Sequence, residues 1–222
     1  MGRRALRTLM KFGGGRAFFS KPIAKETPPA TRGSSGLDQF TSYLQAGQGL
    51  SVLDMSGASQ ANIVFVTGFG HRISSDDIIG TMMEHFGSDF LANQQAASNA
   101  QRFLDHALTF PDASFDAILV WDALQFLRPP LLDQTIAQLL RVLRRGGAML
   151  VFFNADEKAT SIPVYNYRIQ DRKTLLQSPR FGCVPQKPQY FNNRMLERTF
   201  SAASSIKFFL TRDHLRELIV RK

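Results

Sequence analysis

The sequence predicts an α/β domain built on a doubly wound, mostly parallel sheet. Short apolar runs, which are typical of strands covered on both faces, alternate along the chain with segments of helical periodicity. The last two apolar runs, 205–210 and 215–220, are joined by only four residues and must therefore run antiparallel. With five earlier strands, this C-terminal hairpin gives a predicted sheet of seven strands.

The first predicted strand ends at Leu53, with Asp54 at its carboxyl edge. A loop of small residues, 56–59, follows this acid and would let a ligand approach the backbone closely. Residues 62–67 are apolar and rich in β-branched side chains, as in a strand. The topology requires a crossover at this point, so we predict a buried helix instead.

The later elements continue the same alternation, and acids stand at the ends of several strands. The predicted helix at 129–145 ends in Arg141, Arg144 and Arg145, whose positive charges would suit its carbonyl end. Two glycines then stop this helix before the fifth strand. Strands are predicted at 71–75, 102–104, 115–121 and 148–153, helices at 77–86 and 129–145, and strand-end acids at Asp76, Asp105 and Asp122.

The domain prediction places a basic, disordered tail at residues 1–36 and a folded domain at 37–222. Arginines, glycines and prolines in the tail cannot bury enough apolar surface to order it. The tail holds seven of the formal +9 charges, so the domain itself is close to neutral. Nucleic acid is therefore a partner that the tail could contact but that the domain does not favour.

The single cysteine, Cys183, excludes an internal disulfide and a cysteine-only metal cage, and we predict no metal site. A reducing cytoplasm is the simplest compartment. An organelle is the alternative, since the arginine-rich, acid-poor start resembles a transit peptide. No apolar run approaches the roughly 18–20 residues of a membrane span. Nothing in the sequence indicates an oligomeric state.

Residues 154–193 lose the regular alternation, and we interpret them as an insertion over the strand ends. The ends of parallel strands form the edge at which open α/β sheets bind ligands. Tyr165, Tyr167 and Arg168 are the residues of this insertion that would best contact a substrate, although aromatic residues often only pack.

Three stretches make the sequence resemble the class I S-adenosylmethionine-dependent methyltransferases, and the type 11-like members in particular. They are VLD at 52–54, FPDASFDAILVWDALQFL at 110–127 and LLRVLRRGGAMLVFF at 139–153. The last two are similar to the family's fourth strand and to its following helix, glycine turn and fifth strand. The resemblance covers about 38–222 and implies a Rossmann-like fold with S-adenosylmethionine as cofactor.

The first loop departs from the family pattern, in which the acid is followed by three alternating glycines. Those positions hold Ser56, Ala58 and Gln60, with Gly57 out of phase. Side chains restrict positive φ and thicken the loop where it would meet the cofactor. Gln60 is the substitution that weighs most against cofactor binding.

The resemblance also implies roles for individual residues. Asp54 and the loop would border the amino-acid end of the cofactor, Asp76 would accept its ribose hydroxyls, and Asp77 would instead cap the next helix. Asp105, beside the backbone of His106, would hold the adenine amino group. The predicted cofactor-binding residues are Asp54, Ser56, Gly57, Ser59, Asp76, Asp105, His106, Trp121 and Asp122, the last two lining the methionine portion.

The predicted function is methyl transfer from S-adenosylmethionine to an unidentified small-molecule acceptor. The chemistry needs alignment more than a dedicated base, so no catalytic residue is singled out; base candidates are Asp122, His106, Tyr165 and Tyr167. One alternative is an inactive interaction protein of the same fold. Another is an RNA- or ribosome-directed methyltransferase recruited by the tail, although no Asn-Pro-Pro-Tyr-like motif stands at 121–124. An NAD enzyme is disfavoured because GxGxxG is absent.

Overall fold

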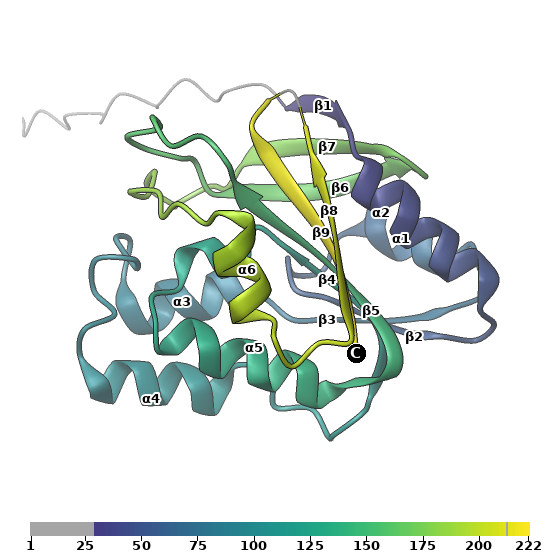
Figure 1. Cartoon of the computed structure of the whole chain (residues 1–222), viewed down its shortest axis with the longest axis horizontal. Coiled ribbons are helices and arrows are strands. Elements are labelled where there is room, and N and C mark those ends of the chain that lie inside the picture. Colours follow the sequence, from purple (N-terminus) through teal and green to yellow (C-terminus); the bar gives the residue numbers. More distant parts are fainter. Residues whose placement is uncertain (1–28, 212) are drawn as a thin grey trace, which may run out of the picture.

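The computed structural model describes residues 29–211 and 213–222. Its main sheet has six strands in the order β3-β2-β4-β5-β9-β8, with β2, β3, β4 and β5 parallel and the last two antiparallel (Figure 1). The predicted Rossmann-like α/β class with a C-terminal hairpin is confirmed. The strands are β2 (Ser51–Asp54), β3 (Arg72–Ser75), β4 (Phe115–Trp121), β5 (Leu143–Asn154), β8 (Ser205–Leu210) and β9 (Leu215–Arg221).

Helices cover both faces of this sheet, as expected when parallel strands are joined by crossovers. Apolar residues of α1 and α2 pack on one face, and those of α3, α4, α5 and α6 on the other. The predicted helix at 62–67 is confirmed by α2. The helices are α1 (Ser35–Ala46), α2 (Gln60–Thr67), α3 (Ile78–Phe86), α4 (Ala97–His106), η1 (Ala123–Phe126), α5 (Leu131–Val142) and α6 (Asn193–Thr199).

The strand predicted at 102–104 is wrong, and the sheet of the described residues therefore has six strands rather than seven. These residues lie in α4, where Phe103 is fully buried while Arg102 and Asp105 are exposed. Phe103 packs against Phe86 of α3, with ring centroids 5.6 Å apart. One buried residue per turn suits a helix, whereas a central parallel strand would need apolar neighbours on both faces.

The end of α5 also differs from the prediction. This helix stops at Val142, and Arg144 and Arg145 already belong to β5. Arg141 donates to the carbonyls of Leu108 and Phe110, and Arg144 to that of Ala113. Arg141 thus keeps its predicted place in the last turn of α5, whereas Arg144 lies beyond the helix; both also fasten the turn before β4 to α5 and β5.

A second, three-stranded sheet lies beside the main one (Figure 1). It contains β6 (Tyr165–Asp171) and β7 (Thr174–Pro179) from the predicted insertion, and β1 (Ala30–Gly33), which pairs antiparallel with β7. Residues 30–36 are thus part of the fold, and the predicted tail boundary at residue 36 falls inside α1. Residues 1–28 lie outside the described part of the chain.

Glu217 of β9 joins the start of the described chain to the main sheet. Its side chain is fully buried and accepts hydrogen bonds from Ser34 Oγ at 2.9 Å and from the Gly36 amide at 2.6 Å. Arg32 of β1 lies 3.5 Å away and pairs with it. Burial raises the pKa of the Glu217 carboxyl, and these partners offset part of that rise.

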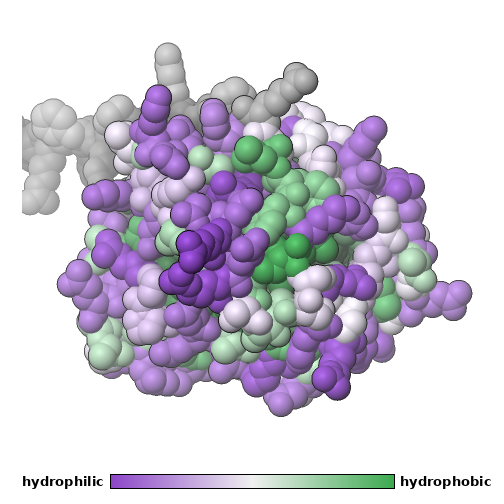
Figure 2. Space-filling view, viewed as in Figure 1, coloured by the Kyte–Doolittle hydropathy of each residue, from purple (hydrophilic) through white to green (hydrophobic). Residues whose placement is uncertain are grey.

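The surface over the hairpin β8–β9 carries a band of apolar side chains near the middle of the view in Figure 2. Strand β8 is the edge of the main sheet and pairs only with β9 among the described strands. Leu210, at its end, is 69% exposed. None of the described helices combines the length and the apolar content that crossing a bilayer would require.

Candidate functional site

The carboxyl ends of β2, β3 and β4 meet at one edge of the sheet, as their parallel register requires. Backbone hydrogen bonds tie this edge together. The Asp76 amide donates to the Asp54 carbonyl at 2.9 Å, and the Gly57 amide donates to the Asp76 carbonyl at 2.9 Å. Asp54, Asp76, Trp121 and Asp122 therefore follow adjacent strand ends, as the sequence predicts for a ligand site.

Asp54 is fully buried, and protein groups satisfy its carboxylate. Oδ1 accepts from the Ser56 hydroxyl and from the Trp121 indole N–H, both at 2.8 Å. Oδ2 accepts from Asn62 Nδ2 at 2.7 Å. Such a carboxylate orients the loop and the indole around it, and any contact with a ligand would be made through those groups.

Trp121 closes the edge at the end of β4. Its φ of +59° is a left-handed value that a bulky residue rarely adopts, and it accompanies a register shift between Leu119 and Trp121 in the pairing with β5. The indole stacks on the Tyr167 ring with centroids 5.2 Å apart and planes 5° from parallel. Strand β6 thereby places its aromatic side chain over the predicted cofactor edge.

Asp122, the next residue, is buried, and its carboxyl has the most strongly shifted pKa among the acids of this edge. Burial raises the pKa of its carboxyl from 3.8 to about 7. Hydrogen bonds from Tyr167 and Gln125 oppose that rise only in part. A carboxyl that exchanges its proton near neutral pH is suited to general acid–base work, so Asp122 is the best-placed base candidate.

The two acids after β3 have different surroundings. Asp77 accepts from the Gly80 amide at 2.9 Å and caps α3, as predicted. Its carboxylate also pairs with Arg180, which follows β7. Asp76 is half-buried, and its burial raises the pKa of its carboxyl, while backbone N–H groups of Leu108 and Asp77 partly offset the rise.

The space against Asp122 is almost filled. Only about 10 Å³ of cavity remains there, enough for roughly one water molecule. Small-ligand pockets usually measure about 300–1,000 Å³. The residues that fill this space from the second sheet and the segment after it are Tyr165, Tyr167 and Arg180.

A larger cavity of about 560 Å³ lies beside the loop that precedes α2. Gly57 has a φ of +84°, a conformation that favours glycine at this one position of the loop. Ser59 stands at the N-cap of α2 without a side-chain capping bond. Gln60 is exposed at the first turn of α2 and lines the cavity. The opposite wall comes from β6, through Asn166, Tyr167 and Arg168.

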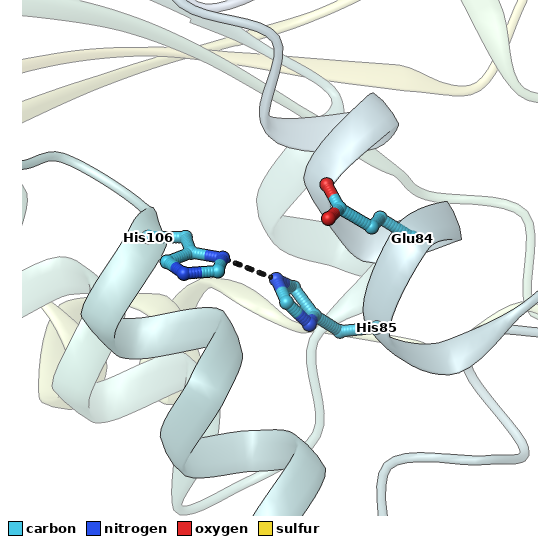
Figure 3. Close-up of side chains that lie close together, drawn as sticks. All are labelled: Glu84, His85 and His106. Atoms are coloured by element: carbon cyan, nitrogen blue, oxygen red, sulfur yellow. Dashed lines mark hydrogen bonds between the residues drawn. The ribbon is translucent and has the colours of Figure 1, made fainter.

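Two of the predicted residues lie on α4 rather than at a strand end, because 102–104 is helical. Asp105 is exposed on α4, where it accepts from Gln101 Nε2 at 2.8 Å. His106 ends the same helix and meets His85 of α3, with 2.9 Å between Nδ1 and Nε2 (Figure 3). The strand-end position that suggested an adenine contact for Asp105 does not exist.

Asn62 is a residue of the candidate site to which the sequence analysis assigns no role. It is fully buried in α2 and bonds to Asp54, to the Tyr167 carbonyl at 3.2 Å and to the Ile169 amide at 2.8 Å. One amide side chain thus joins the loop acid to β6. The available signal was a polar residue at the start of an otherwise apolar helix, which indicates a buried hydrogen-bonding partner.

The comparisons with known proteins bear on this edge directly. Residues 53–151, which span β2 to most of β5, match the family model described as "Methyltransferase domain". This match, over a little under half of the chain, is to the family that the sequence resembles, the class I methyltransferases. The predicted resemblance is confirmed, and the matched part of the methyltransferase domain contains every strand end of the candidate site.

Solved structures of low sequence identity are similar to this chain over most of its length. The PH0226 protein of Pyrococcus horikoshii OT3 is 14% identical, with a TM-score of 0.50 over 84% of this chain and 87% of its own. A Burkholderia thailandensis 1,6-didemethyltoxoflavin-N1-methyltransferase, solved with bound 1,6-didemethyltoxoflavin and S-adenosylhomocysteine, is 16% identical, with a TM-score of 0.46 over 85% of this chain and 79% of its own. The glycopeptide N-methyltransferase MtfA is 14% identical, with a TM-score of 0.45 over 85% and 95%. No curated protein matches the sequence significantly.

Proposed function

We propose that the chain is an S-adenosylmethionine-dependent methyltransferase that acts on a small-molecule acceptor. The observation that supports this most is the match at 53–151, because it covers the loop after β2 and the acids that follow β2, β3 and β4. When bound, the cofactor supplies a methyl group already activated by the sulfonium charge. The protein then has to orient the acceptor, exclude water and, for a protonated nucleophile, remove a proton.

The residues of the edge divide this work. The loop with Ser56, Gly57 and Ser59, held in place by Asp54, would border the amino-acid end of the cofactor. Asp76 would accept ribose hydroxyls. Trp121 would wall the methionine portion, and Asp122, with its pKa of about 7, would take the acceptor's proton. Asp105 and His106 have no role in this proposal.

In the structure Tyr165, Tyr167 and Arg180 fill the space beside Asp122, and this closed arrangement sets a condition on the proposed function. The acids and the loop of this edge have the chemistry to bind the cofactor, but the cavity of about 10 Å³ beside Asp122 is too small to hold it. Strand β6 and the segment after β7 must therefore withdraw before binding. The contacts that oppose that movement include the bonds of Asn62 to β6 and the ion pair between Arg180 and Asp77.

That same filled space supports a second candidate, a methyltransferase-fold protein that binds no cofactor and acts through its surface. Titration of the full chain with S-adenosylmethionine and S-adenosylhomocysteine separates the two. Trp121 is the only tryptophan and lies at the site, so its fluorescence reports binding alongside calorimetry. The enzyme proposal expects saturable binding of both compounds. Neither heat nor a fluorescence change at about 1 mM ligand would support the second candidate.

Replacing Arg180 by alanine should tighten S-adenosylmethionine binding by about threefold to tenfold. The variant removes a partly buried ion pair that holds the closed arrangement, and such a pair contributes about 1 kcal/mol to one side of an opening equilibrium. Calorimetry of the variant measures the change. The matched control is Arg172→Ala, which removes an exposed pair with Asp38 at 3.7 Å. Equal or weaker binding by the Arg180 variant would show that the ion pair between Arg180 and Asp77 does not hold the site closed.

A further inference from the structure

The last turns of α3 and α4 bring together three side chains that can bind a metal ion. They are Glu84, His85 and His106, whose ligand atoms all lie within 4.8 Å of one another. The two imidazoles come from different helices and face each other across the gap between them, with the Glu84 side chain extending from α3 nearby (Figure 3). None of these three residues has a role in the proposed methyltransferase site, and the cluster does not rest on that proposal.

The distance between the imidazoles suits one shared ion. His85 Nε2 and His106 Nδ1 share a hydrogen bond of 2.9 Å, which a shared ion would replace. With metal–nitrogen bonds of about 2.0–2.1 Å, that separation gives an N–metal–N angle of roughly 90°. Such an angle belongs to tetragonal or octahedral coordination, and a small opening of the exposed His106 side chain would reach the tetrahedral angle.

The electrostatic surroundings favour a cation at the same point. His85 is in the last turn of α3, and His106 is the last residue of α4. The carbonyl ends of both helices, which carry partial negative charge, therefore lie near the two rings. Glu84 adds a full negative charge where the helix dipole disfavours one, and none of the ion pairs among the described residues includes it.

The core fixes the two helices before any ion arrives. Phe86 follows His85 directly and packs against Phe103, with centroids 5.6 Å apart. Both phenylalanines are buried, so the backbone positions of the two histidines are held by the core. A site whose ligands are positioned in this way loses little conformational freedom on binding.

From these observations we propose that Glu84, His85 and His106 form a site for a divalent transition-metal ion of the imidazole-binding class, such as Zn²⁺, Ni²⁺ or Cu²⁺. Water would complete the coordination at this exposed position. The ion would join the C-terminal ends of α3 and α4, and its role would be structural. This revises the sequence-based prediction of no metal site, which could not see ligands 21 residues apart meet.

The test is isothermal titration of the full chain, free of any affinity tag, with ZnCl₂ and NiCl₂ in a buffer without chelators. We expect saturable binding of one ion and a rise in Tm of about 5–10 °C at a metal concentration near 100 times the Kd. His85→Gln and His106→Gln keep a polar side chain across the gap and should each weaken binding at least about tenfold. Cu²⁺ electron paramagnetic resonance should show two coordinating nitrogens in the native chain and one in each variant.

The remaining histidines and the cysteine provide the controls. His71 is buried and bonded to Leu50 and to the Leu44 carbonyl, so it is not a competing ligand. His214→Asn and Cys183→Ser should leave binding unchanged. Absence of saturable binding in the native chain, or loss of binding in either control but not in the two Gln variants, would overturn the proposal.

Discussion

Asp122→Asn is expected to stabilise the protein at neutral and alkaline pH and to flatten part of its pH–stability profile. Burial raises the pKa of the Asp122 carboxyl from 3.8 to about 7. A folded-state pKa above the unfolded one means that the stabilising contribution is complete below about pH 4 and is lost as the pH rises to about 7. Over that window the wild-type chain loses up to about 4 kcal/mol through this group.

Asparagine has nearly the same shape but no ionisable proton, so the variant escapes this loss. The difference in unfolding free energy between variant and wild type should therefore grow in favour of the variant between about pH 4 and pH 7 and remain constant above it. Denaturant unfolding at a series of pH values measures it. Asp112→Asn, at an exposed carboxylate paired with Arg141, is the control and should follow the wild-type profile. A difference that does not change with pH would show that Asp122 is ionised in the fold throughout.

Asn62→Ala should lower the free energy of unfolding by about 3 kcal/mol or more. The substitution removes two donor contacts and one acceptor contact, and it leaves Asp54, the Tyr167 carbonyl and the Ile169 amide short of a buried partner. Each unsatisfied buried group costs about 1–3 kcal/mol. Urea unfolding followed by Trp121 fluorescence measures the loss.

The same variant also tests how β6 is held. Without Asn62 the second sheet loses its hydrogen bonds to α2, so amides of β6 should exchange with deuterium faster than those of β4. Asn193→Ala, at an exposed position at the start of α6, provides the reference and should change stability by less than about 0.5 kcal/mol. An Asn62 variant as stable as that reference would mean that the buried bonds contribute nothing net.

The central part of the fold could be predicted from sequence because its signals are local and strong. Strand β4 is apolar except for Asp116, and α2 is predicted from the crossover that must follow β2. The strand prediction at 102–104 is wrong because three residues are too few to distinguish a strand from one buried turn of a helix. Phe103 alone faces the core there, and that became visible only with its partner Phe86.

The site was predictable only as far as its strand ends. Asp54, Asp76 and Asp122 could be placed because parallel strands end at the same edge. Nothing local indicates that Tyr167 stacks on Trp121 or that Arg180 reaches Asp77, since both contacts join residues far apart in sequence. Gln60 is exposed in the first turn of α2 and lines the larger cavity, whereas the filled space lies further along the edge, under β6.

Strand β1 has a mechanical consequence for this edge. Ala30–Gly33 pair with β7, β7 pairs with β6, and β6 carries the tyrosines that cover Asp122. Arg32 of the same strand is tied to Glu217 in the main sheet. The arginine-rich residues before Ala30 are therefore covalently joined to an outer strand of the cover itself. Any displacement of β1 would therefore be transmitted to Tyr165 and Tyr167 through two hydrogen-bonded strand pairings.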